Sequence, residues 1–163
     1  MPIVDQVLWD VGAGCGSVAI EWMRSHPRCM AVAIEKSKTR LKMIEKNAIQ
    51  LGVPLLKIVP GTLPDVLEHL PLPDAIFVGG GLSNFKQQDS SSMLELCWKL
   101  LKPGGRLVAH AVTFETEQQL LSWHKKHGGY LTRLSISRAD SIGKFKGWKP
   151  LRPVTQYSVT KEY

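Results

Sequence analysis

Long apolar runs, paired cysteines and a P-loop are all missing from this chain of 163 residues. No stretch approaches the ~18 to 20 uninterrupted apolar residues that span a bilayer, and no basic-then-apolar leader precedes Leu8. The three cysteines form no Cys-x-x-Cys pair, which argues against a disulfide scaffold or a zinc site. His124 and His127 lie three residues apart without an evident third ligand. We therefore expect a cytoplasmic protein with reduced thiols and no bound metal.

Acidic residues are scarce only in the last third of the chain. Residues 1–100 carry ten Lys or Arg and ten Asp or Glu, whereas residues 101–163 carry eleven and four. The excess is densest between Arg133 and Arg152, where six basic residues face only Asp140. This segment is either an ordinary solvated surface or a positive rim for a polyanion, such as nucleic acid or a small molecule with many carboxylates.

Short apolar runs alternate with amphipathic stretches, a pattern typical of parallel βαβ units with helices on both faces of an open sheet. Only residues 139–153, which we expect to form a loop, separate the last two strands, so these should make an antiparallel hairpin at one edge. The predicted fold is one α/β domain over residues 1–163 with a mostly parallel seven-stranded sheet. The predicted strands are Gln6–Val11, Cys29–Glu35, Lys57–Val59, Ala75–Gly79, Arg106–Val112, Tyr130–Arg138 and Val154–Lys161, and the predicted helices are Ser17–Arg24, Lys38–Leu51, Ser90–Leu101 and Thr116–His127.

Three glycines at alternate positions follow the first predicted strand in DVGAGCGSVA, Asp10–Ala19. At the carboxyl end of a parallel strand, glycines let the backbone turn sharply and let a ligand lie against it, and the following helix N-terminus favours an anion. A P-loop needs Lys and Ser or Thr after the last glycine, and Ser17, Val18 and Ala19 stand there instead. The GxGxxG fingerprint of dinucleotide-binding proteins would need glycine at Ser17, so the spacing here is GxGxG.

Glu35 ends the second predicted strand, 19 residues after Gly16. An acid at this place can accept hydrogen bonds from both ribose hydroxyls of an adenosine, in NAD as in other adenosine-bearing cofactors. Alternatively, the carboxylate interacts with the N-terminus of the helix that follows. These residues alone leave the choice of cofactor open.

Three longer segments narrow that choice: DVGAGCGSVAIEW (Asp10–Trp22), PGTLPDVLEHLPLPDAIFVGGGL (Pro60–Leu82) and LKPGGRLVAHAVTFETE (Leu101–Glu117). Together they resemble the carbon-15-methylating domain of the decarboxylating precorrin C(5,15)-methyltransferases of cobalamin biosynthesis, and the resemblance extends from Val7 to the end of the chain. It implies a Rossmann-like class I methyltransferase fold with S-adenosylmethionine as cofactor. It also implies methylation of carbon 15 of a precorrin, with decarboxylation of an acetate side chain.

By position, the resemblance assigns the cofactor to the glycine turn, the acid after the second strand and the end of the fourth strand. The turn after the third strand, residues 61–63 from Gly61 to Leu63, should flank the adenine. The predicted cofactor-binding residues are Gly12, Ala13, Gly14, Cys15, Gly16, Glu35, Lys36, Thr62, Leu63 and Gly79. A late precorrin carries many carboxylates around a flat ring, so a basic rim with aromatic side chains suits it. The predicted substrate-binding residues are Gly80, Gly81, Arg138, Lys144, Lys146 and Trp148. Alternatively, Phe145 and Trp148 pin the C-terminal hairpin to the sheet.

Two residues are candidates for catalysis. His110, at the end of the fifth predicted strand, is placed to orient the substrate or donate a proton, although a hydrogen-bonded core histidine is the alternative. The family pattern leads us to expect Asn at this position. Glu115 is either an acid in the pocket wall or a residue at a helix start.

The resemblance also bears on assembly and on rival functions. Family members form tetramers and carry a helix before the first strand, whereas only Met1–Gln6 precede it here. We expect a homo-oligomer that lacks this helix. A carbon-5 methyltransferase domain, fused or separate, is the expected partner. FVGGGLSN (Phe77–Asn84) replaces the Asn/Asp-Pro-Pro-aromatic motif, and no cysteine follows a proline, so nucleic acid is not the expected substrate. The alternatives are an RNA or protein methyltransferase that uses the basic C-terminal region, a cofactor-binding module without turnover and, more distantly, an NAD-binding protein.

Overall fold

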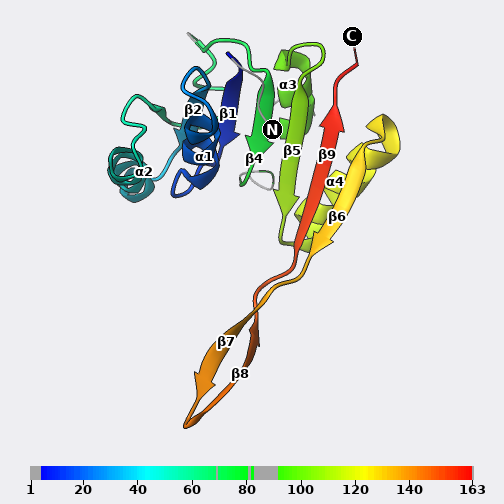
Figure 1. Cartoon of the computed structure of the whole chain (residues 1–163). Helices are drawn as coiled ribbons and strands as arrows, with labels where there is room; N and C mark the ends of the chain where they lie inside the picture. The colour runs from blue at the N-terminus through cyan, green and yellow to red at the C-terminus, as the bar shows by residue number, and fades with distance from the viewer. Residues whose placement is uncertain (1–4, 69, 81, 83–91, 163) are drawn as a thin grey trace.

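The computed structural model describes residues 5–68, 70–80, 82 and 92–162, and it shows a central sheet with helices on both sides (Figure 1). The strands are β1 (Val7–Val11), β2 (Met30–Glu35), β3 (Lys57–Pro60), β4 (Ala75–Val78), β5 (Arg106–Ala111), β6 (Tyr130–Leu134), β7 (Ser137–Ile142), β8 (Phe145–Pro150) and β9 (Val154–Thr160). The helices are α1 (Ser17–Ser25), α2 (Lys38–Gln50), α3 (Met93–Leu100) and α4 (Phe114–His127).

Seven strands pair in the order β3-β2-β1-β4-β5-β9-β6. β1 to β5 run parallel, and β9 lies antiparallel between β5 and β6. The predicted mostly parallel sheet with an antiparallel C-terminal edge is therefore confirmed. Strand order reverses between β1 and β4, and in open α/β sheets ligands bind in the crevice at the carboxyl ends of such strands.

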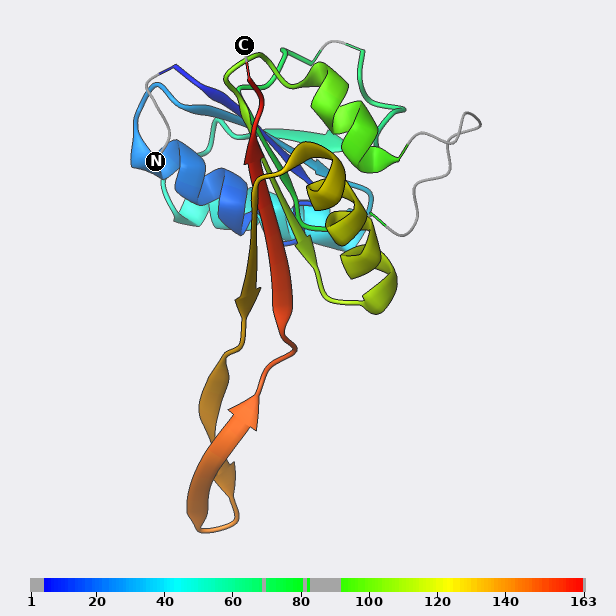
Figure 2. The ribbon, with the colours of Figure 1, turned by 90° about the vertical axis from the view of Figure 1, so that its right-hand side faces the viewer.

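The two faces of the sheet bury separate hydrophobic clusters. α1 and α2 cover one face, where Ile20 and Ile44 are fully buried, and α3 and α4 cover the other, where Leu94 and Leu120 are fully buried (Figure 2). Because β1 lies under helices on both sides, all five of its residues are buried. Burial on both faces explains why β1 reads as an apolar run rather than as alternating apolar and polar residues.

Hydroxyl side chains cap the N-termini of three helices, and at α2 Ser37 accepts from the Arg40 amide. Ser92 accepts a hydrogen bond from a backbone amide in the first turn of α3, so the described helix begins at Met93, and its predicted start at Ser90 lies outside the described residues. Thr113 forms a capping box at α4, so this helix begins at Phe114, two residues earlier than predicted. Within the described ranges, none of the helices is long and apolar enough to cross a membrane.

The prediction of a loop over residues 139–153 is wrong. Two further strands, β7 and β8, pair antiparallel there as a separate two-stranded sheet, which we call the arm (Ser137–Pro150). Gly143, with a φ of 60°, opens a two-residue turn between Ile142 and Phe145, and glycine in this position suits a tight hairpin. The arm continues β6 and β9 beyond the carboxyl edge of the sheet and extends away from the rest of the molecule (Figures 1 and 2).

Candidate active site

The glycine turn, residues 12–16, connects β1 to α1. Gly12 has a φ of 71°, and a Cβ atom there would lie 3.0 Å from the carbonyl oxygen of Gly80. The backbone segments that follow β1 and β4 therefore approach closely only because Gly12 has no side chain. Gly16 serves a different purpose, because a Cβ atom there would lie 2.9 Å from Cγ2 of Ile44 in α2. Glycine at this position lets α1 pack against α2.

Backbone hydrogen bonds hold the turn in shape. The amides of Gly12 and Ala13 donate to the carbonyl oxygen of Ile34 at 2.9 and 3.1 Å, and the amide of Gly16 donates to Ala13 at 2.8 Å. The four residues Ala13, Gly14, Cys15 and Gly16 build the turn and are not among the residues that line the cavity described below. Their contact with a cofactor stays a prediction.

Glu35 joins the glycine turn to the start of α2. Its Oε2 accepts a hydrogen bond from the Gly14 amide at 2.9 Å, and its Oε1 accepts one from the Ser37 amide at 3.0 Å. The carboxylate is only 4% exposed, and Nη1 of Arg40 lies 3.8 Å from Oε2. The predicted alternative, an interaction of Glu35 with the start of the following helix, is thus present at Oε1, which contacts the N-terminus of α2. Because a carboxylate oxygen has two lone pairs, each can also accept a hydrogen bond from a ribose hydroxyl.

Asp10 is a buried acid that the sequence prediction left without a role. Its Oδ2 accepts a hydrogen bond from the Ala19 amide in α1 at 3.0 Å. Burial raises the pKa of Asp10 to about 6; the Ala19 amide opposes this rise, and the charge of Glu35 adds to it. An acid inside an otherwise apolar strand was the available sequence signal. The side chain of Asp10 thus connects β1 to α1, and it lies close enough to Glu35 to feel its charge.

A cavity of about 540 Å³ opens at the carboxyl ends of β1 to β4. Its volume falls within the range of roughly 300–1,000 Å³ that is typical of small-molecule sites. The predicted residues that line it are Gly12, Glu35, Lys36, Thr62, Leu63 and Gly79 from the cofactor set and Gly80 from the substrate set. Gly61, from the predicted turn of residues 61–63, also lines it, and the lining residues that the prediction missed are Val11, Ile34, Arg40, Pro64, Asp65 and Met93. Gly81 lies outside the described residues.

The segment after β3 forms one wall of this cavity. The Gly61 amide donates to the carbonyl oxygen of Glu35 at 3.0 Å, which holds this wall against the end of β2. The Thr62 hydroxyl donates to Oδ2 of Asp65 at 3.1 Å, and Leu63 is buried. The wall therefore combines the apolar side chain of Leu63 with the hydrogen-bonded side chains of Thr62 and Asp65.

His110 lies outside the cavity lining but close to it. Its Nε2 is 2.9 Å from Oε1 of Gln156 in β9, and its ring meets the Phe77 ring edge-on with centroids 4.8 Å apart. A Cβ atom added to Gly79, which lines the cavity, would lie 2.9 Å from Cε1 of Phe77. One aromatic ring thus separates His110 from the cavity wall.

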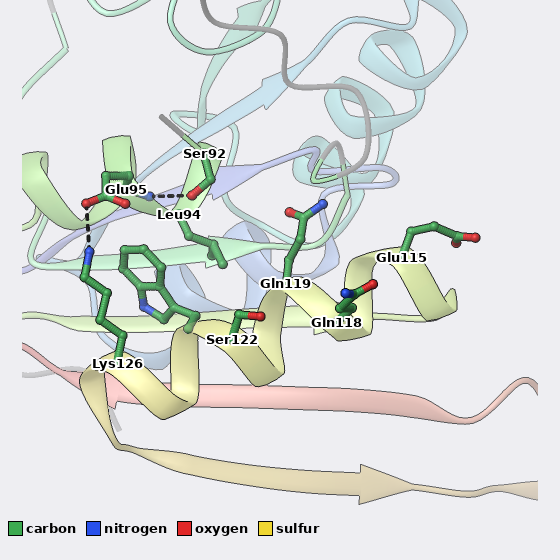
Figure 3. A pocket seen from close by; sticks show the side chains of 9 residues that line it. Ser92, Leu94, Glu95, Glu115, Gln118, Gln119, Ser122 and Lys126 are labelled. Carbon is green, nitrogen blue, oxygen red and sulfur yellow. Dashed lines mark hydrogen bonds and ion pairs between the residues drawn. The ribbon is translucent and has the colours of Figure 1, made fainter. Parts of the chain in front are cut away.

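Glu115 belongs to a different part of the surface. It lies at the exposed start of α4, where its own backbone amide and the Thr113 hydroxyl lower the pKa of its carboxyl group. Figure 3 shows it at one end of a groove of about 440 Å³ between α3 and α4, with the Glu95–Lys126 ion pair at the other end. The groove is lined by Ser92, Leu94, Glu95, Glu115, Gln118, Gln119, Ser122, Trp123 and Lys126. The structure therefore does not bring the two predicted catalytic residues, His110 and Glu115, together.

The arm carries the other predicted substrate residues. Arg138, Lys144, Lys146 and Trp148 all lie on it or in its turn, and all are exposed and outside both cavities. Phe145 is 79% exposed and Trp148 is 77% exposed. The alternative that these two aromatic side chains pin the hairpin to the sheet is therefore wrong for the single chain.

The two histidines of α4 have aromatic neighbours. His127 stacks on Trp123 with ring centroids 4.2 Å apart, and His124 meets the Tyr157 ring edge-on. Among the residues that the structure describes, no group of three or more His, Cys, Asp or Glu side chains is placed to hold a metal ion.

Comparison with known proteins identifies the family. The model of the precorrin methyltransferase domain matches residues 1–161. A precorrin-6Y C(5,15)-methyltransferase [decarboxylating] of Sinorhizobium sp is 47% identical over 160 residues, which cover 98% of this chain and 37% of that relative. A cobalt-precorrin-6B C(15)-methyltransferase (decarboxylating) of Salmonella typhimurium is 30% identical over 95% of this chain and 79% of its own length. The chain thus spans little more than a third of one relative and most of the other.

Solved structures agree with this result. The crystal structure of the C-terminal domain of precorrin-6Y C5,15-methyltransferase from Rhodobacter capsulatus superposes with a TM-score of 0.85 at 39% identity, covering 98% of this chain and 83% of that one. The Rossmann-like class I methyltransferase fold implied by the sequence is confirmed. The chain belongs to the precorrin methyltransferase domain family, a family of S-adenosylmethionine-dependent enzymes.

Proposed function

We propose that this chain uses S-adenosylmethionine to methylate carbon 15 of a precorrin and to release the carboxyl group of an acetate side chain as carbon dioxide. The observation that supports this function is the cavity between Gly12, Glu35 and Gly80 at the strand-order reversal, in a chain of the precorrin methyltransferase family. The relatives' names supply the substrate class and the decarboxylation.

The lining residues fit the proposed cofactor. Gly12 leaves room for the amino-acid end, Glu35 offers acceptors for the ribose hydroxyls, and the wall at residues 61–63 flanks the adenine. When bound, S-adenosylmethionine supplies an electrophilic methyl group on a sulfonium centre. The charged residues of the lining are Glu35, Asp65, Lys36 and Arg40, so acidic and basic groups are both at hand for a cofactor whose amino-acid end carries charges of both signs.

The main task of the protein in methyl transfer is alignment, which contributes up to ~7 to 11 kcal/mol in well-oriented reactions. Gly79 and Gly80 follow β4 without side chains, so a flat acceptor can approach the cavity closely on this side. His110 lies one ring beyond Gly79 and donates the proton that replaces the departing carboxyl group. Replacing His110 with Ala should slow decarboxylation, and unchanged turnover would remove it from the mechanism.

The arm supplies the proposed contacts to substrate carboxylates and between copies of the chain. Twelve residues form its two strands, and all but Gly147 are exposed, including Ile142, Phe145 and Trp148. A two-stranded hairpin is at best marginally stable alone in water. We therefore propose that the arms of neighbouring copies pack against one another in a homo-oligomer, which we predict to be a tetramer. We also propose that Arg138, Lys144 and Lys146 attract the anionic substrate.

Residues 1–163 are proposed to form a single domain, because the seven-stranded sheet includes both the first strand, β1, and the last, β9, and the family model matches nearly the whole range. A carbon-5 methyltransferase domain, fused or separate, is the proposed partner, in line with the C(5,15) name of the Sinorhizobium relative. The absence of the family's N-terminal helix stays a prediction. A cytoplasmic location is proposed because the three cysteines form no Cys-x-x-Cys pair and no disulfide pattern.

The test combines the protein with S-adenosylmethionine and cobalt-precorrin-6B, the substrate named for the Salmonella relative, and follows products by mass spectrometry. The proposal expects a product that has gained a methyl group and lost carbon dioxide. Binding of S-adenosylhomocysteine without any conversion would indicate a cofactor-binding module. Salt-sensitive RNA binding without affinity for tetrapyrroles would indicate an RNA methyltransferase.

A further inference from the structure

We infer that Gln156 is a positioning residue that holds His110 with its proton on Nε2 and leaves Nδ1 as the nitrogen that exchanges protons with the substrate. This inference rests on the proposed function, because it assigns the working atom of the proposed proton donor.

The first step is the position of the pair in the sheet. Ala109 and Ala111 are buried toward α3 and α4, so His110, between them on β5, points to the opposite face. Gln156 lies directly opposite His110 on β9 and points the same way, since its neighbours Thr155 and Tyr157 are buried. Phe77 of β4 lies opposite Val108, and its ring contacts the His110 ring diagonally.

The second step is the hydrogen bond. Oε1 of Gln156 lies 2.9 Å from Nε2 of His110. In this orientation of the Gln156 amide the carbonyl oxygen faces the ring and accepts, which assigns the hydrogen to Nε2. In the neutral ring this leaves Nδ1 as an acceptor, and in the charged ring Nδ1 carries the second hydrogen. Gln156 therefore suits both protonation states, and only the proton on Nδ1 comes and goes.

The third step is distance from the cavity. Phe77 contacts the His110 ring on one side and lies under Gly79 on the other. Gly79 is in turn close to Gly12, since a Cβ atom added to Gly79 would lie 3.5 Å from the Gly12 carbonyl oxygen. An acceptor ring that reaches the cavity over Gly79 therefore passes close to His110.

The reaction step balances with these groups alone. The bond between the methylene and carboxyl carbons of the acetate arm breaks, and carbon dioxide leaves. The electron pair passes into the conjugated ring system and returns to the methylene carbon, which takes the proton from Nδ1 of charged His110. The products are a methyl group, carbon dioxide and a neutral His110 that still donates from Nε2 to Gln156.

The test uses three variants of the full chain. Gln156→Met removes the acceptor at similar size, and Gln156→Glu keeps an acceptor in its place. Ser158→Ala is the matched control, because Ser158 lies two residues further along the same face of β9. Nitrogen-15 NMR of the imidazole ring reports which nitrogen of His110 carries the proton, with its signals assigned from a His110→Gln spectrum.

The wild-type protein and the Gln156→Glu and Ser158→Ala variants should show neutral His110 protonated on Nε2, whereas Gln156→Met should show a mixture of both forms. With cobalt-precorrin-6B, Gln156→Met should lower kcat for carbon dioxide release by about 100-fold, since a placed proton donor contributes at least that much. Its KM should stay within about twofold, because the loss arises in the transition state. A methylated product that keeps its carboxyl group should accumulate, and Gln156→Glu should restore most of the release.

Two results would overturn the inference: a wild-type His110 protonated on Nδ1, or Gln156→Met and Gln156→Glu variants that behave alike. The pH dependence of the rate does not test the inference, because Asp10 on β1, whose pKa is raised to about 6, would contribute to it. If the wild-type protein converts no precorrin, the proposed function fails, and the nitrogen spectra still decide whether Gln156 holds His110.

Discussion

Gly12 and Gly52 offer a matched pair for testing the shape of the cavity. Both adopt a left-handed backbone conformation, with φ values of 71° and 80°. Alanine in this region costs about 1–2 kcal/mol at either position. A Cβ atom at Gly12 would also lie 3.0 Å from the Gly80 carbonyl oxygen, whereas a Cβ atom at Gly52 would meet nothing within 4 Å. Only Gly12→Ala must therefore displace a segment that lines the cavity, and overpacking of this kind adds about 1–3 kcal/mol.

Urea unfolding and calorimetric titration with S-adenosylhomocysteine measure the two effects separately. We expect Gly52→Ala to lose about 1–2 kcal/mol of stability and to bind the ligand like the wild-type protein. Gly12→Ala should lose more stability and at least about tenfold in affinity, which corresponds to about 1.4 kcal/mol. Equal affinities for the two variants would refute the argument that the approach of Gly12 to Gly80 shapes the cofactor site.

The remaining predictions concern charge, a helix end and the arm. Because the pKa of Asp10 is raised from 3.8 to about 6, folding binds its proton more tightly, and this stabilisation is lost as pH rises through that interval. Asp10→Asn should remove roughly 3 kcal/mol of this pH dependence in urea unfolding, and an unchanged slope would contradict the assignment. Lys161 donates from Nζ to three carbonyl groups at the end of α3. Lys161→Met should therefore lower the free energy of unfolding by about 1–3 kcal/mol, whereas Lys125→Met, at an exposed position of α4, should leave it unchanged. Replacing Phe145 and Trp148 with Ser should shift the molar mass measured by light scattering toward the monomer; an unchanged oligomer would place the contact elsewhere.

The sheet was predictable because its signals are local. β1 is buried on both faces and reads as an apolar run, and the spacing of Ile44 and Ala48 marks the buried side of α2. The arm was missed because its strands are exposed on both faces and lack a one-sided apolar pattern. The Gly143-Lys144 pair was the available turn signal.

The candidate site was predictable in part for a similar reason. Gly12 and Glu35 are recognised by their positions after strands, and both line the cavity. The hydrogen bonds of Glu35 to Gly14 and Ser37 depend on how the turn and α2 meet, which no local pattern reports. Gln156 lies 46 residues from His110, and only the pairing of β5 with β9 brings them together.

A crystal of this protein soaked with S-adenosylhomocysteine tests the central claim most directly. The account predicts ligand density in the cavity after β1, with the amino-acid end against Gly12 and both ribose hydroxyls donating hydrogen bonds to Glu35. A ligand bound elsewhere, or a cavity that stays empty at saturating ligand, would contradict it.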